Sequence, residues 1–241
     1  MEEIRYGEDH AQFGELSRPD GRSKGVVVVI HGGFWRAAYD LSLGRPLAAS
    51  LVEHGWTAYN LEYRRVGNGG GYPQTLDDVA AGIDALAAVD GLDTSTVVTL
   101  GHSAGGHLAV WAAGRPKLTG TPWGHPAVRV TAAVSQAGVL DFHTAVHLGS
   151  GAAKAFMGEH DDSTYADPTA QIPLDVPVRC VHSAADDTVP IGQSIDYVDR
   201  ATAAGADAQL VEVEGDHFVV IDPASTAWDR TLQVLESLPA P

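Results

Sequence analysis

The chain has 241 residues, 44% of them hydrophobic, and no apolar run in it approaches the ~18 residues of a membrane-spanning helix. Its formal net charge of −16 argues against nucleic acid and anionic membranes as partners, because both are themselves negative. With one cysteine, Cys180, no intramolecular disulfide can form, and the first residues lack the basic and apolar regions of a signal peptide. We therefore expect a cytoplasmic protein with a single domain over residues 1–241.

Strand and helix patterns alternate through the first half of the chain. The wholly apolar, β-branched run Val26–Ile30 predicts a strand buried on both faces. Leucines at every fourth position from Leu43 predict a helix that ends at Gly55. The other expected elements are a short edge strand at 12–16, a strand at 56–61, a helix at 76–87 and a strand at 96–100.

The second half continues this alternation with one interruption. Strands are expected at 130–135, 176–181 and 209–213, and a helix at 191–202. Asp222 and Pro223 predict the start of the last helix, as its N-cap and first residue. Residues 137–172 lack a period and suggest a small irregular cap with short helices; the sequence leaves open whether it moves as a lid. The order predicts an α/β fold, with a mostly parallel sheet covered by helices on both faces.

A serine stands where the strand at 96–100 gives way to a helical segment. Gly101, Ser103 and Gly105 form the G-x-S-x-G pattern of a nucleophile elbow, a sharp turn that projects the serine from the sheet edge. Glycines are required because a side chain at either position would collide with the neighbouring strand or helix. Ser103 is therefore the candidate nucleophile.

A serine hydroxyl needs a base, and the base needs a group that orients it. In this kind of sheet the order along the chain is Ser, Asp, His, each on a loop after a strand. His217 follows the strand at 209–213 and is the candidate base. Asp186, which begins an Asp-x-x-Val-Pro pattern after the strand at 176–181, is preferred as the acid, with Asp187 second and Asp141 third.

Acyl transfer also needs donors for the oxyanion that forms. The backbone N–H of Ala104, which follows the nucleophile, is the first candidate. The glycine-rich loop after the strand at 26–30 supplies the others, the N–H groups of Gly33 and Phe34. Aromatic side chains at Trp35, Tyr39, Phe142 and Phe218 are candidates for the lining of a substrate pocket.

The motifs His31–Trp35, Gly101–Gly106 and Gly215–Phe218 together resemble those of the α/β-hydrolase superfamily, over nearly the whole chain. Among its members the chain is most similar to small cytosolic carboxylesterases and to kynurenine formamidases, whose oxyanion loop has the pattern HGGxW. Phe34 replaces the third glycine of the HGGG loop of lipase-like members, which narrows the acyl side of the pocket. The resemblance implies a small-molecule ester or amide substrate, with an aryl formamide such as N-formylkynurenine as the alternative to an ester.

These observations predict a serine hydrolase that works without a cofactor on small carboxylic esters. His143 and His147 have the spacing of two metal ligands on a helix, but no glutamate completes the H-E-x-x-H pattern, so no metal site is expected. A non-catalytic binding protein on the same scaffold is the contrasting hypothesis, which failure to react with a fluorophosphonate would favour. The oligomeric state stays open, with a homodimer as one option.

Overall fold

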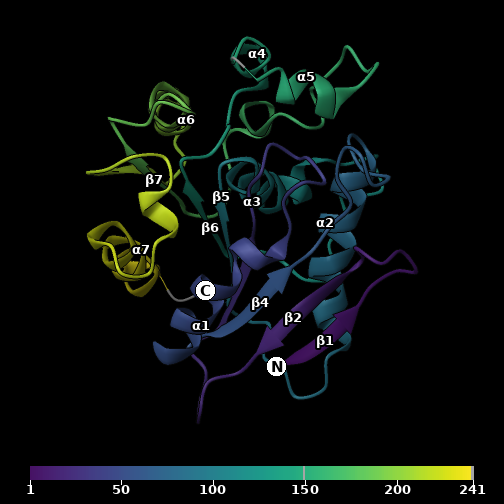
Figure 1. Cartoon of the computed structure of the whole chain (residues 1–241), viewed down its shortest axis with the longest axis vertical. Helices are drawn as coiled ribbons and strands as arrows, with labels where there is room; N and C mark the ends of the chain where they lie inside the picture. The colour runs from purple at the N-terminus through teal and green to yellow at the C-terminus, as the bar shows by residue number, and fades with distance from the viewer. Residues whose placement is uncertain (149, 240–241) are drawn as a thin grey trace.

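The computed structural model describes residues 1–148 and 150–239. Its centre is a sheet of eight strands in the order β1-β2-β4-β3-β5-β6-β7-β8 (Figure 1). The strands β3 to β8 run parallel, and β2 joins β4 antiparallel. The strand bounds are Glu2–Arg5 (β1), Phe13–Ser17 (β2), Val26–Ile30 (β3), Thr57–Leu61 (β4), Val97–His102 (β5), Ala132–Gln136 (β6), Val178–Ser183 (β7) and Ala208–Val213 (β8).

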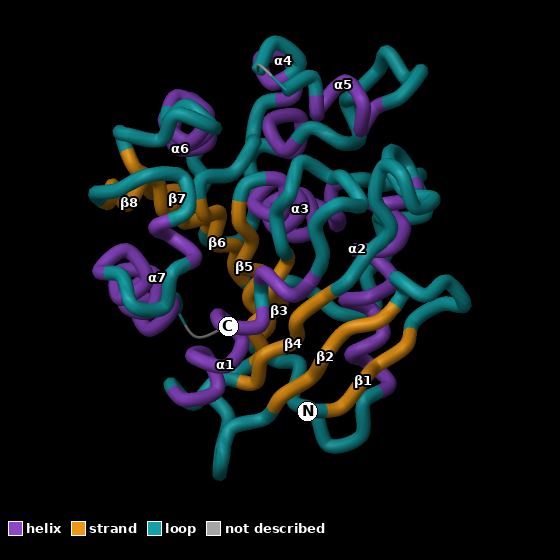
Figure 2. Tube along the Cα trace, in the orientation of Figure 1, coloured by secondary structure: helices purple, strands orange, loops and turns teal. Residues whose placement is uncertain are grey.

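Helices cover both faces of this sheet, which confirms the predicted α/β-hydrolase architecture (Figure 2). One face packs against α1 (Arg45–Glu53) and α7 (Thr226–Ser237). The other packs against α2 (Gln74–Asp84), α3 (Ala104–Gly114) and α6 (Gly192–Ala203). All five residues of β3 are buried, as expected for a strand with a parallel neighbour on each side and a helical layer above and below.

Two sequence predictions need correction at the ends of the chain. The strand at 13–17 is not an edge strand, because β1 pairs with its outer side from Glu2 to Arg5. The last helix begins after Ser225, whose hydroxyl accepts the Trp228 N–H at 3.0 Å, and not at Asp222. Asp222 instead accepts the N–H of Ala224 in a turn before the helix.

The segment between β6 and β7 holds short helices, as its lack of a long period predicts. These are α4 (Phe142–Ala145), α5 (Ala152–Met157) and the 3₁₀ turn Pro168–Gln171. In Figure 1 α4 and α5 lie beyond the end of the sheet to which the parallel strands β3 to β8 run. No helix in the described ranges is long and apolar enough to cross a membrane.

Candidate active site

Ser103 occupies the turn between β5 and α3 with a backbone conformation that few residues adopt. Its φ of 55° and ψ of −116° lie in a strained region, and the residue is buried. A Cβ at Gly101 would lie 2.0 Å from the carbonyl oxygen of Gly105, and a Cβ at Gly105 would lie 2.0 Å from that of Ile30. The two glycines therefore allow the turn to press against the central strand.

His217 and Asp186 meet at the ends of β8 and β7. Nδ1 of His217 lies 2.6 Å from Oδ2 of Asp186, and both side chains are almost fully buried. Oδ1 of Asp186 accepts the backbone N–H groups of Thr188 at 2.9 Å and Val189 at 2.8 Å. Burial alone would raise the pKa of Asp186, but hydrogen bonds from His182, His217 and these amides hold it well below its usual range. The carboxylate is thus ionised beside the His217 ring.

A second histidine connects the His217 loop to the turn that carries Ser103. Nε2 of His102, the residue before Ser103, lies 2.9 Å from the backbone carbonyl oxygen of His217, and the two ring centroids are 4.5 Å apart. Among the described residues no hydrogen bond joins the Ser103 hydroxyl to the His217 ring. Such contacts are often long before substrate binds.

The two other candidate acids lie away from His217. Asp141 caps α4 through the Thr144 N–H at 3.1 Å and pairs with Arg200 at 3.1 Å. Asp187 is exposed, and its carboxylate accepts the Thr188 hydroxyl at 3.2 Å. Of the three, Asp186 alone is in contact with the candidate base in the described part of the chain.

The loop after β3 holds three consecutive residues at positive φ. These are Gly33 at 111°, Phe34 at 59° and Trp35 at 53°. In the structure as described, neither Phe34 nor Ala104 gives its N–H to another backbone group, and Ala104 opens α3, where the first N–H groups have no helical partner. Both donors are thus available near Ser103.

The family model described as BD-FAE matches residues 16–200, which is most of the chain. The chain belongs to the BD-FAE family. The comparison with curated proteins found no matching sequence.

Solved structures resemble this BD-FAE chain in fold. A truncated carbohydrate esterase from gut microbiota has 21% identity and a TM-score of 0.80, over 97% of this chain and 94% of its own. The native structure of esterase Est2 from Thermogutta terrifontis has 21% identity and a TM-score of 0.81, over 98% and 90%. Esterase B from Lactobacillus rhamnosis has 20% identity and a TM-score of 0.83, over 98% and 84%. The closer resemblance to kynurenine formamidases stays a prediction.

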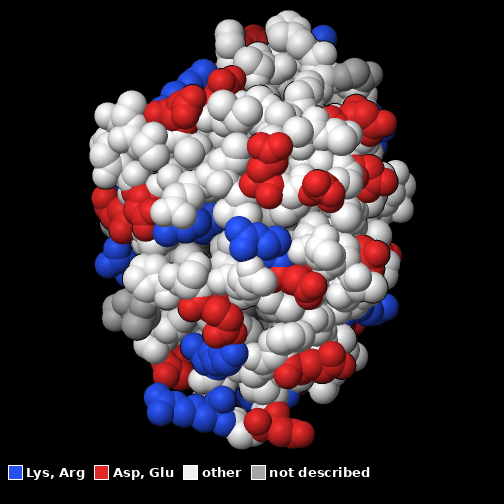
Figure 3. All heavy atoms as spheres, turned by 90° about the vertical axis from the view of Figure 1, so that its left-hand side faces the viewer, with Lys and Arg blue, Asp and Glu red and all other residues white. Residues whose placement is uncertain are grey.

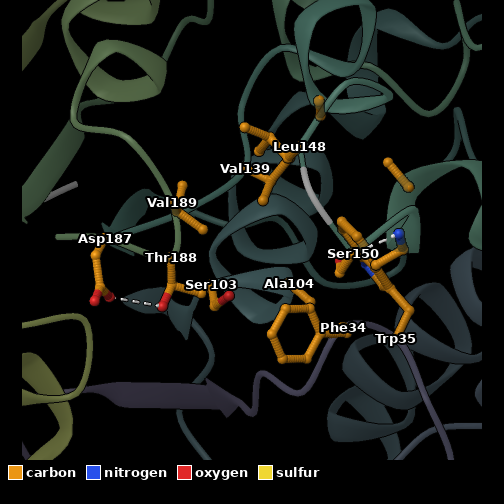
Figure 4. A pocket seen from close by; sticks show the side chains of 13 residues that line it. Phe34, Trp35, Ser103, Ala104, Val139, Leu148, Ser150, Asp187, Thr188 and Val189 are labelled. Atoms are coloured by element: carbon orange, nitrogen blue, oxygen red, sulfur yellow. Dashed lines mark hydrogen bonds between the residues drawn. The ribbon is translucent and has the colours of Figure 1, made fainter.

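A cavity of about 300 Å³ opens beside the serine of this BD-FAE protein. Figure 4 shows Ser103, Ala104 and Phe34 on one side of the cavity, below, with Val139 and Leu148 opposite them, above. Its wall is mainly small and apolar, and its residues are Phe34, Trp35, Ser103, Ala104, Val139, Ala145, Leu148, Ser150, Ala152, Ala153, Asp187, Thr188 and Val189.

The four predicted pocket aromatics have different positions. Trp35 lines the cavity, whereas Phe142 lies in the core against the Trp35 ring, with 5.6 Å between the ring centroids. Tyr39 is partly exposed and packs against Phe34. Phe218 is 58% exposed and lies edge-on to the His217 ring. These three are outside the lining of the cavity as described.

Sequence reasoning missed three buried histidines around the candidate site, namely His102, His107 and His182. His107 lies on α3, where its Nε2 is 2.7 Å from the carbonyl oxygen of Ala166 and its Nδ1 accepts the indole N–H of Trp35 at 3.2 Å. Burial lowers the pKa of both His102 and His107 to about 3, so both rings are neutral. Residue type and nearness to the motifs were the only signals in the sequence. The described residues include no group of three or more metal-ligating side chains placed to hold an ion.

Proposed function

We propose that this protein is a serine hydrolase that cleaves small carboxylic esters through an acyl-enzyme intermediate on Ser103. The observation that carries the proposal is the 2.6 Å contact between Asp186 and His217, beside a serine held on a strained strand-to-helix turn. Membership of the BD-FAE family, and a fold shared with proteins described as esterases, support an ester as the substrate.

Each residue of the site has a role in this reaction. His217 takes the proton of the Ser103 hydroxyl as its oxygen attacks the ester carbonyl, and Asp186 stabilises the imidazolium that forms. The alcohol leaves with the proton that His217 returns to it. Water then gives a proton to His217, attacks the acyl group and releases the acid, so that Ser103 recovers its hydrogen.

The oxyanion of each tetrahedral intermediate is bound by backbone groups. The N–H groups of Ala104 and Phe34, with Gly33 as a third candidate, would each contribute about 2.7–4 kcal/mol to transition-state stabilisation. The cavity of about 300 Å³ is at the small end of ligand pockets, which favours compact acyl groups.

Removal of the nucleophile tests the proposal directly. Ser103→Ala should lower kcat for p-nitrophenyl acetate by about 10⁶, because the three residues act as a unit. Ser42→Ala, at an exposed serine far along the chain, should leave the rate unchanged. Unchanged turnover by Ser103→Ala would contradict the proposal.

Two further measurements separate the competing functions. A fluorophosphonate should label the wild-type protein and not Ser103→Ala; an unlabelled wild type would favour a non-catalytic binding protein. Rates on p-nitrophenyl acetate, p-nitrophenyl octanoate and N-formylkynurenine should be highest for the acetate. A preference for N-formylkynurenine would favour the aryl formamide amidase instead.

A further inference from the structure

Asp186 has a second histidine on the oxygen that faces His217. Its Oδ2 lies 2.6 Å from Nδ1 of His217 and 3.2 Å from Nε2 of His182. His182 lies on β7, four residues before Asp186, and its side chain has no exposed surface. Two imidazole rings therefore share one carboxylate oxygen in the protein interior.

The contacts of His182 assign its proton to Nε2. That nitrogen lies near two groups that only accept hydrogen bonds here, the ionised carboxylate of Asp186 and the carbonyl oxygen of Val189 at 2.9 Å. Nδ1 lies 2.8 Å from the hydroxyl of Ser194 on α6, which can donate to it. With its proton on Nε2 and the Ser194 hydroxyl donating to Nδ1, the ring satisfies every one of these contacts.

We propose that His182 is a positioning residue that tunes the Asp186–His217 pair; this inference rests on the proposed function. Its Nε2–H holds the carboxylate in place and withdraws negative charge from the oxygen that His217 uses. A carboxylate with an extra donor attracts the proton of the imidazolium less strongly. His182 thereby lowers the pH at which His217 becomes protonated and activity is lost on the acid side.

Other groups near the His217 ring do not supply this effect. His102 faces it from β5 but stays neutral, since burial lowers its pKa to about 3. Asp216, on the same loop, directs its carboxylate to the backbone N–H groups of Phe218 and Val219. Asp187 and Glu214, on the loops after β7 and β8, have exposed side chains.

Three variants test the role of the His182 donor. His182→Phe keeps a ring but removes the donor, and should lower kcat/KM by about fivefold to tenfold, the equivalent of one hydrogen bond. Its acid limb should move up by about half a pH unit, because the unassisted carboxylate favours protonated His217. His182→Gln should restore the limb, since its amide nitrogen is as many bonds from Cα as Nε2. Ser194→Ala removes the hydroxyl beside Nδ1, so that the proton of His182 is no longer held on Nε2. This variant should move the acid limb up, as His182→Phe does, but by less.

The pH–rate profile separates this role from a structural one. A lower rate with an unmoved acid limb in His182→Phe, or a Gln variant that behaves like the Phe variant, overturns the proposal. The downfield proton resonance of the His217 Nδ1–H gives a readout independent of turnover and should move in His182→Phe. If the Phe variant does not fold, an unmoved acid limb in Ser194→Ala overturns the proposal.

Failure of the proposal for His182 can be distinguished from failure of the proposed function. An inactive Ser103→Ala variant with an unmoved limb in the His182 series would leave the hydrolase standing and remove only the tuning role. Full activity in Ser103→Ala would remove both.

Discussion

Asp186 differs from the two other candidate acids in what surrounds its carboxylate. Both its oxygens accept hydrogen bonds, one from backbone amides and one from histidine rings. Asp187 is one residue away but lies at the margin of the cavity, where its carboxylate accepts the Thr188 hydroxyl, as Figure 4 shows. The sequence pattern ranks these neighbours only weakly, because a one-residue shift on a loop changes neither composition nor spacing enough to decide between them.

Exchange of each aspartate for asparagine distinguishes the three. Asp186→Asn should lower kcat by about 10⁴, since it leaves His217 in the wrong tautomer without its counter-charge. Asp187→Asn and Asp141→Asn are matched controls and should stay within about tenfold of wild type, with p-nitrophenyl acetate as substrate. A 10⁴-fold loss in either control instead would move the acid to that residue.

Some of the elements around the site could be predicted from the sequence, and others could not. Val26–Ile30 was predicted with its observed bounds because a strand buried on both faces has an unbroken apolar pattern. The sequence does not predict strand β1, because Glu2–Arg5 lies at the sheet edge with mostly exposed side chains. The start of α7 was misplaced because Asp222 and Ser225 both suit an N-cap, and only tertiary structure selects between them.

Gly105→Ala tests the close approach of α3 to the central strand. The new Cβ would lie 2.0 Å from the carbonyl oxygen of Ile30 and 2.6 Å from that of His31, and neither is a flexible atom. We expect a loss of unfolding free energy of about 3 kcal/mol or more, measured by urea denaturation. Gly192→Ala is the control, because an added Cβ there meets nothing within 4 Å. Equal stability of the two variants would contradict the packing argument.

The candidate catalytic residues could be placed from sequence because each one follows a predicted strand. The roles of His102 and His107 could not, because their acceptors are distant in the chain. His102 bonds to a carbonyl 115 residues away, and His107 to one 59 residues away. No local pattern encodes such a pair, and the side chain at the accepting residue plays no part in it.

At the scale of the whole molecule, charged side chains on the surface contrast with two uncharged histidines in the interior. Acidic side chains predominate in the sequence and are interspersed with basic ones on the face in Figure 3. Inside, His102 and His107 stay uncharged because burial lowers the pKa of each to about 3. In the unfolded chain the pKa of both side chains is near 6.5. Between about pH 3 and pH 6.5 the unfolded state therefore binds more protons than the folded state.

Stability should therefore fall as the pH falls below about 6.5. Between pH 7 and pH 5 each of the two histidines should remove about 2 kcal/mol from the free energy of unfolding. Urea denaturation at a series of pH values measures this dependence. His107→Phe should have a lower free energy of unfolding than wild type at pH 7. Between pH 7 and pH 5 it should lose about 2 kcal/mol less than wild type, because one of the two histidines is absent. An identical slope in wild type and variant would show that His107 is not buried neutral.

His107 and His182 each bond to a main-chain carbonyl, those of Ala166 and Val189. Every amino acid supplies that oxygen, so substitution at the accepting position leaves the bond intact provided the chain path is kept. The segments that contain Ala166 and Val189 can thereby change their side chains, within the limits that packing in the core sets, while their anchorage persists. Libraries randomised at Ala166, which is buried in the core, should for this reason tolerate small apolar replacements, whereas libraries randomised at His107 should lose the hydrogen bond with every replacement that lacks a donor.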